Sequence, residues 1–169
     1  CVVKVEGMRG LQTSCSVKAA DNMVVQTNTE DILAAQKMIV NLLLASGQHN
    51  CLSCEANGDC ELQDAAYYLK IETPEFLIET ELPVIDDSGE FIVIDHRKCI
   101  KCGRCVVGDN STVVNEVLDF GFRGHDTKVI CDDDLPMGVS TCVQCGECVQ
   151  LCPVGAILDK KAIGKGRSW

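Results

Sequence analysis

The feature that most constrains this chain is a run of closely spaced cysteines near its C-terminal end. The run holds four cysteines followed directly by a proline: Cys142, Cys145, Cys148, Cys152 and Pro153. A second run with the same three-residue step lies upstream: Cys99, Cys102 and Cys105. Thiolates at such short spacing are typical of metal ligands. The chain has 13 cysteines in 169 residues, and their tight grouping argues against a secreted disulfide scaffold.

The downstream run resembles that of the bacterial ferredoxins, in which three cysteines bind one 4Fe–4S cluster and the fourth binds the other cluster of a pair. Zinc is the alternative, because Cys-x-x-Cys pairs also hold zinc. The triplet followed by Cys-Pro fits a four-iron cluster better. The ferredoxin rule then implies two ligand sets: Cys99, Cys102, Cys105 and Cys152 for one cluster, and Cys142, Cys145, Cys148 and Asp109 for the other.

Asp109 stands four positions after Cys105, where the ferredoxin rule calls for a cysteine. A carboxylate is a harder ligand than a thiolate, and iron–sulfur sites favour soft donors. We therefore expect either a 4Fe–4S cluster with one oxygen ligand or a 3Fe–4S cluster that has lost the iron at that corner. The alternative is that Asp109 caps the following turn, as Asp often does.

A third ligand group lies earlier in the chain: His49, Cys51, Cys54 and Cys60. Spacing alone leaves a Cys3His zinc site open, because imidazole and thiolate bind both metals. With the trailing Glu61-Leu-Gln, the segment resembles the His/Cys3 4Fe–4S site of the large iron–sulfur subunit of respiratory complex I, of the FeFe hydrogenases, and of the iron–sulfur subunits of NAD-linked hydrogenases and formate dehydrogenases. Many of those proteins have three residues between the histidine and the first cysteine, whereas this chain has one.

The N-terminal residues resemble the second half of a plant-type 2Fe–2S ferredoxin domain. Residues 1–6 are rich in β-branched residues and predict a strand, and residues 23–25 predict another. Cys1 and Cys15 match the last two of the four cysteines of that family, and the first two would precede residue 1. The resemblance implies a 2Fe–2S cluster that this chain, which looks truncated, binds only in part. The alternative is that both are buried structural cysteines.

Apolar residues three or four apart predict two helices. The first starts at Thr29 with a hydroxyl cap and acidic residues in its first turn, and Gly47 ends it. We expect its apolar stripe to be packing. The second spans residues 59–69 and stops before Thr73-Pro74. Residues 91–94 predict a strand that leads into Cys99.

The predicted fold class is α+β, in five segments: 1–28, the C-terminal half of a 2Fe–2S β-grasp domain; 29–72, a small helical His/Cys3 domain; 73–90, a connection; 91–159, a two-cluster ferredoxin domain; and 160–169, a basic tail or linker. Residues 113–124 resemble an insertion in the same enzyme families. We expect Cys131 to be a buried thiol outside the ligand sets, and His96 and His125 to be ordinary surface or hydrogen-bonded residues.

Composition excludes several classes of function. The net charge of −10 argues against nucleic acid as a partner. No apolar run approaches the length of a membrane helix, and the cysteine usage predicts a reducing cytoplasm. The sequence holds neither a P-loop nor a Gly-x-Gly-x-x-Gly motif after a strand.

The resemblance implies an iron–sulfur electron-transfer module of a multi-subunit, NAD(P)-linked oxidoreductase. Its partners would be flavin- and NAD(P)-binding iron–sulfur subunits and a formate dehydrogenase or hydrogenase catalytic domain or subunit. A Gly-Arg-x-Trp stretch at residues 166–169 is similar to the junction in formate dehydrogenases that precedes the molybdenum- or tungsten-pterin body. The alternative function is a zinc-bound structural or interaction module.

Overall fold

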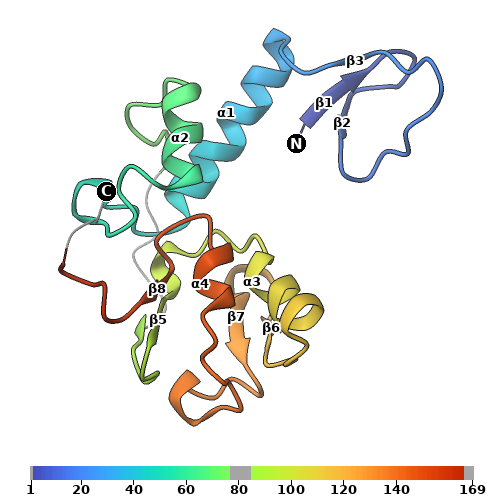
Figure 1. Cartoon of the computed structure of the whole chain (residues 1–169). Coiled ribbons are helices and arrows are strands. Elements are labelled where there is room, and N and C mark those ends of the chain that lie inside the picture. The colour runs from blue at the N-terminus through green and yellow to red at the C-terminus, as the bar shows by residue number, and fades with distance from the viewer. Residues whose placement is uncertain (1, 77–84, 166–169) are drawn as a thin grey trace.

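Short strands form small antiparallel sheets in residues 2–76 and 85–165, which the computed structural model describes. In the first sheet β1 lies between β2 and β3, in the second β5 lies between β4 and β8, and β6 and β7 form a hairpin (Figure 1). The strands are β1 (Val2–Val5), β2 (Leu11–Thr13), β3 (Val25–Gln26), β4 (Ile85–Asp86), β5 (Ile92–Asp95), β6 (Leu118–Gly121), β7 (Lys128–Cys131) and β8 (Ile157–Asp159).

Helices connect these sheets and carry most of the cysteines or flank them. The α-helices are α1 (Glu30–Ala45), α2 (Glu61–Tyr68), α3 (Arg104–Val107) and α4 (Glu147–Leu151). A π-helical segment, η3 (Gly108–Val113), continues α3. Single 3-10 turns are η1 (Cys51–Ser53), η2 (His96–Lys98), η4 (Gly124–Asp126) and η5 (Met137–Val139). The result is a mixed helix and strand structure, as the α+β prediction required.

The N-terminal sheet lies at one end of the molecule, and α1 leads from it toward α2 (Figure 1). Val3 and Val5 are buried on alternate positions of β1, and Ile32 in the first turns of α1 is fully buried. Because burial at every second residue gives a strand one apolar face, β1 has a face that α1 can cover. The predicted strand over residues 1–6 is confirmed for residues 2–5.

The start of α1 confirms the predicted position but corrects the predicted cap. Thr29 is the N-cap residue, yet its hydroxyl binds no backbone N–H of the helix. It donates instead to the Asp31 carboxylate, which in turn accepts the backbone N–H of Ile32 at 3.2 Å. The hydrogen bond from Thr29 lowers the pKa of Asp31 to about 2, and Lys4 contributes further. The Asp31 carboxylate, and not the Thr29 hydroxyl, therefore accepts a backbone N–H of the first turn.

The apolar stripe of α1 is only partly buried, which corrects the expectation that it is all packing. Ile32 and Leu44 lie in the interior, whereas Met38, Ile39 and Leu42 are exposed. None of the helices within residues 2–76 and 85–165 has the length and apolar character needed to cross a lipid bilayer.

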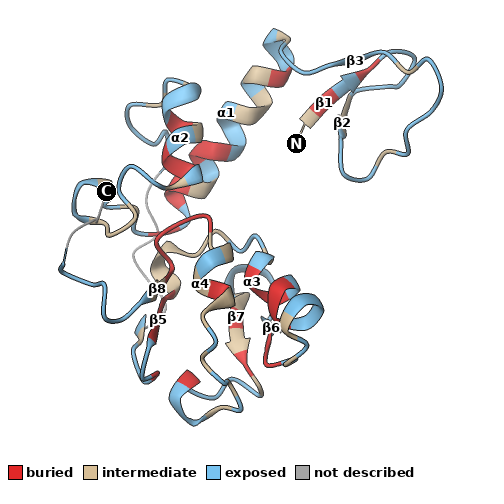
Figure 2. Ribbon diagram, viewed as in Figure 1, coloured by how far each residue is buried: buried red, intermediate tan, exposed pale blue. Residues whose placement is uncertain are grey.

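Two hydrophobic cores organise the rest of the molecule (Figure 2). One joins α1 and α2 to the segment after Cys152; its buried members are Val40, Leu44, Leu62, Ala66, Val154 and Ala156. The other lies among β5, β8, α3, α4 and the β6–β7 hairpin, and includes Ile92, Ile94, Cys105, Val117, Leu118, Val129, Met137, Cys148 and Ile157. Cys99 and Cys152 pack against both cores, so they sit at the junction between them.

The connection and the tail are described in part. Residues 77–84 and 166–169 lie outside the described residues, and so does Cys1. In the connection, β4 pairs with β5 through Ile85 opposite Asp95. In the tail, the Lys160 backbone N–H donates to Phe91 O at 2.7 Å, and the Gly164 N–H donates to the Glu55 carboxylate at 3.0 Å. The predicted tail is therefore attached to the body over residues 160–165.

Candidate metal centres

The His/Cys3 group surrounds a cavity of about 530 Å³, which is lined by all four predicted ligands: His49, Cys51, Cys54 and Cys60. The turn η1 carries Cys51, and Cys60 is the N-cap residue of α2. Gly155 closes one wall so tightly that a Cβ there would lie 2.6 Å from Cys54 Sγ. The local fold therefore reserves space beside these sulfur atoms.

His49 is oriented by a backbone carbonyl. Its Nε2 lies 3.1 Å from Leu43 O, so a neutral ring that donates there keeps Nδ1 as the free acceptor. Burial lowers the pKa of His49, the hydrogen bond to Leu43 opposes this change, and the nearby charge of Lys98 lowers the pKa further. A neutral imidazole whose other nitrogen is fixed by a carbonyl is the usual form of a metal-bound histidine.

The second group lines a smaller cavity between the two cores: Cys99, Cys102, Cys105 and Cys152. Cys152 comes from a segment 47 positions after Cys105, and the crossover rule predicted this meeting. Burial, with contributions from the neighbouring thiols Cys99 and Cys152, raises the pKa of Cys105 to about 12. Metal binding requires thiolates, so a cationic cluster core would stabilise the ionised form of Cys105 that burial disfavours.

The two ferredoxin runs have the same local backbone. In each run the residue before the second cysteine has a positive φ (Lys101 55°, Gln144 51°), and the glycine after it does too (Gly103 76°, Gly146 86°). The backbone N–H of Lys101 donates to Cys99 Sγ at 3.4 Å, and that of Gln144 donates to Cys142 Sγ at 3.4 Å. Hydrogen bonds of this kind to sulfur are one means by which proteins tune cluster potentials.

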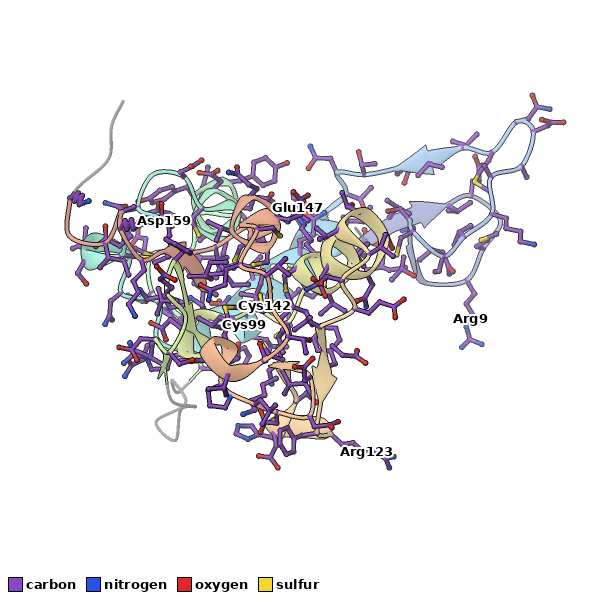
Figure 3. All side chains as sticks on the ribbon, turned by 60° about the horizontal axis from the view of Figure 1, so that its bottom comes forward. Arg9, Cys99, Arg123, Cys142, Glu147 and Asp159 are labelled. Atoms are coloured by element: carbon purple, nitrogen blue, oxygen red, sulfur yellow. The ribbon has the colours of Figure 1, made fainter. Side chains whose placement is uncertain are left out.

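The third group comprises Cys142, Cys145, Cys148 and Asp109. Burial raises the pKa of Cys148 to about 12, with further contributions from Cys142, Cys105 and Cys145, so these thiols lie within electrostatic reach of one another. Burial also raises the pKa of Cys142, and the Asp109 carboxylate contributes. In Figure 3 the half-buried Cys99 and Cys142 lie near the middle of the view, whereas Arg9 and Arg123 project from its edges.

Asp109 is buried in η3 beside this group. Its Oδ2 accepts the backbone N–H groups of Val117 at 2.6 Å and Leu118 at 2.8 Å. These bonds fix the start of β6, eight and nine residues after Asp109. The carboxylate therefore has a structural role, but it does not cap the following turn through these bonds. Both bonds use Oδ2, so the other carboxylate oxygen, Oδ1, can still act as an acceptor or a ligand.

A backbone hydrogen bond joins the first two candidate centres. Glu61, which follows Cys60, donates its N–H to the carbonyl of Pro153, which follows Cys152, at 2.9 Å. Arg104, which precedes Cys105, forms a bidentate ion pair with the Glu61 carboxylate, with Nη2 2.6 Å from Oε2.

The first two donor sets each line a cavity. Among residues 2–76 and 85–165, no group of three or more His, Cys, Asp or Glu side chains is arranged so that it could hold a metal ion. A 4Fe–4S cluster takes four protein ligands, one for each iron, and these are usually cysteines. Its ligands therefore need to surround a cavity, as the first two groups do, and do not have to converge on one point.

The remaining predicted residues fall outside these groups. Cys15 is exposed in a turn after β2. Cys131 is buried, as expected. His96 corrects our expectation of an ordinary histidine, because it is half-buried and its Nδ1 is enclosed with no hydrogen-bond partner. Sequence reasoning missed Lys98, which lines the His/Cys3 cavity, and Gly155, which closes it.

Comparison with known families defines the class of protein. Residues 36–75 match the NADH-ubiquinone oxidoreductase-G iron–sulfur binding region, and residues 98–156 match a 4Fe–4S dicluster domain. The first range contains the predicted ligands of the His/Cys3 cavity, and the second contains Cys99, Cys102, Cys105 and Cys152. The chain is thus an iron–sulfur protein with a ferredoxin-type 4Fe–4S domain.

Individual relatives narrow this class. The chain is 35% identical over 163 residues to subunit HndD of the NADP-reducing hydrogenase of Solidesulfovibrio fructosivorans. This match covers 96% of the chain and 28% of the relative. It is 34% identical over 171 residues to a G-type subunit of the NADH-quinone oxidoreductase of Rhizobium meliloti (100% and 20%), and 32% identical over 160 residues to a protein provisionally named formate dehydrogenase in Staphylococcus haemolyticus (94% and 16%).

A solved structure agrees with these relatives. The crystal structure of an NAD+-reducing NiFe hydrogenase in the H2-reduced state matches with a TM-score of 0.89 and 28% identity, over 100% of this chain and 70% of that chain. The homologues of this chain are thus subunits of NAD(P)-linked hydrogenases, formate dehydrogenases and complex I. The chain spans less than a third of the length of the curated relatives compared here.

Proposed function

We propose that this chain is an electron-transfer module that carries electrons between a flavin/NAD(P) subunit and a distant formate- or hydrogen-oxidising site. The observation that carries the proposal is that two cavities are each lined by the complete ligand set that the spacing had grouped. When bound, iron–sulfur clusters supply one-electron carriers whose potentials depend on ligands, charge and burial. The chain's own residues hold these carriers, exclude water and set the distances between them.

We propose three 4Fe–4S sites. The ligand sets are His49, Cys51, Cys54 and Cys60; Cys99, Cys102, Cys105 and Cys152; and Cys142, Cys145 and Cys148 with Asp109. In the third set Asp109 Oδ1 would be an oxygen ligand, or the corner would lose iron to leave 3Fe–4S. The electrostatic effect of Cys105 on Cys148, and the link from Glu61 to Pro153, support a continuous path through the three sites.

We propose that residues 1–28 are the C-terminal half of a 2Fe–2S domain of β-grasp type. The β2–β1–β3 sheet with Cys15 exposed beside it supports this proposal. Cys1 and Cys15 would then supply two of four ligands. A chain extended upstream by the remaining domain should show an additional 2Fe–2S signal by electron paramagnetic resonance (EPR). If it shows none, Cys1 and Cys15 are not ligands.

The proposed partners are flavin- and NAD(P)-binding iron–sulfur subunits at one end and a formate dehydrogenase or hydrogenase catalytic domain or subunit at the other. Exposed apolar side chains near the N-terminal sheet and the His/Cys3 site support docking there: Val24, Val25, Met38, Ile39, Leu42, Leu52, Tyr67 and Tyr68. The acidic net charge suits basic partner faces. We propose a cytoplasmic setting, because thiol ligands need reducing conditions.

Reduction under anaerobic conditions tests this function. The full-length protein should be brown, bleach with dithionite and give EPR signals that are lost separately in Cys54→Ser and Cys102→Ser. A colourless zinc protein would instead support the second candidate, a structural or interaction module, because Cys-x-x-Cys pairs also bind zinc.

A further inference from the structure

Lys98 places a positive charge at the wall of the His/Cys3 cavity. Its side chain lines that cavity, although it lies far along the chain from His49 and Cys60. Only 19% of the side chain is exposed. The meeting is fixed by backbone contacts, because the Gln48 N–H donates to Arg97 O at 2.8 Å and a Cβ on Gly47 would lie 2.2 Å from that oxygen. The segment before Cys99 therefore packs closely against the segment that carries His49.

The charge of Lys98 is only weakly balanced by its nearest carboxylate. The buried Asp95 already binds Arg97, with Nε 2.8 Å from Oδ1 and Nη2 2.9 Å from Oδ2. Lys98 Nζ lies 3.7 Å from Oδ2, which is beyond hydrogen-bond distance. Burial opposes the ionised form of Asp95, but the bonds from Arg97 and the charge of Lys98 lower the pKa of this carboxyl overall. Arg97 is thus the principal partner of Asp95.

Among the described residues that line the cavity, the other charged one is Glu72, which is exposed. Solvent screens an exposed charge much more than a largely buried one. The neighbouring cavity of Cys99, Cys102, Cys105 and Cys152 has no lysine among its described lining residues. Two cations, Lys101 and Arg104, lie near the thiols of that neighbouring site, but both side chains are exposed and therefore more strongly screened than Lys98.

We propose that Lys98 is a tuning residue that raises the reduction potential of the cluster at His49, Cys51, Cys54 and Cys60 relative to its neighbour. The inference rests on the proposed function, since it requires a cluster in that cavity. One-electron reduction adds one negative charge, and a nearby cation stabilises the reduced state more than the oxidised state. Cluster charge and surroundings set the potential of such sites. Lys98 thus favours electron occupancy of the His/Cys3 site.

An EPR-monitored redox titration of the full-length holoprotein tests this inference. Labelling with 15N-histidine identifies the signal of the His49 site through its nitrogen coupling. Lys98→Met should move the midpoint potential of that signal to a more negative value, and by more than it moves the signal of the Cys99 site. Lys98→Arg should keep the original potential. Lys37→Met should shift neither signal, because Lys37 is an exposed lysine of α1 that pairs with Glu75.

The outcomes separate the inference from the proposed function. An unchanged potential in Lys98→Met overturns the inference while the function stands, and an equal shift in Lys98→Met and Lys98→Arg overturns it in favour of a packing effect. If Lys98→Met loses its clusters, Lys98→Gln takes its place, and the same results decide. Absence of any histidine-coupled signal in the unmodified protein overturns ligation by His49, and the assignment to Lys98 with it.

Discussion

At the scale of single residues, Cys105, Cys131 and Cys148 have almost the same surroundings, although we assign them different roles. All three are buried, and burial raises the pKa of each thiol to about 12. A buried cysteine behaves as a small apolar side chain unless something else uses its sulfur. Spacing in the sequence, and not burial, therefore distinguishes the proposed ligands.

This difference predicts opposite results for two similar substitutions. Cys105→Ala should remove about four irons per chain, because it takes a thiolate from one cluster. Cys131→Ala should cost about 1 kcal/mol of stability, a usual value for a small buried change, and keep every iron. Iron analysis of the two purified variants checks this. Loss of iron in Cys131→Ala would mean that its thiol is a ligand after all.

Asp109 gives a second prediction at this scale, since its two oxygens can serve different purposes. Asp109→Asn keeps an acceptor for Val117 and Leu118, whereas Asp109→Ala leaves both N–H groups without theirs, at a cost of about 1–3 kcal/mol. Both variants should increase the 3Fe–4S signal of the oxidised protein if Oδ1 binds iron. Asp109→Cys should give a cubane that resists oxidation.

The three spectra decide the role of Asp109. If all variants show the cluster signals and lability of the unmodified chain, Asp109 only anchors β6. If Asp109→Ala alone changes the spectrum, the effect comes from the fold and not from iron ligation.

At the scale of elements, local patterns were predictable and contacts between distant segments were not. The helices α1 and α2 could be predicted because apolar residues three or four apart mark one helix face. The β6–β7 hairpin was missed, because its pairing depends on close packing such as that of Gly121 against Ile130, and on Asp109 holding its first residues. Lys98 and Gly155 were missed for the same reason: only tertiary packing brings them to His49 and Cys54.

The two faces of α1 give a prediction at this scale. Ile32→Ala should destabilise the contact between α1 and β1 by about 3 kcal/mol, because it empties a fully buried site. Met38→Ala on the exposed face should stay within about 0.5 kcal/mol. Hydrogen exchange of the β1 amides measures both changes. Equal protection in the two variants would show that α1 does not hold the N-terminal sheet.

At the scale of the whole molecule, the first two candidate centres adjoin each other. Cys99 and Cys152 pack against both cores, and Glu61 connects the His/Cys3 segment to the loop after Cys152. The chain has few aromatic residues, at 4%, so its cores depend on small aliphatic side chains and on cysteine. We therefore expect the clusters, when bound, to form part of the interior and to stabilise the fold, as in other small metal-bound domains.

The central claim is that this chain holds several iron–sulfur clusters, and metal and sulfide analysis of the anaerobically purified protein tests it most directly. Three cubanes predict about twelve irons and about twelve acid-labile sulfides per chain, or about eleven irons if the corner at Asp109 is empty. Any 2Fe–2S cluster would add to these numbers. Zinc at a few ions per chain without labile sulfide would contradict the account.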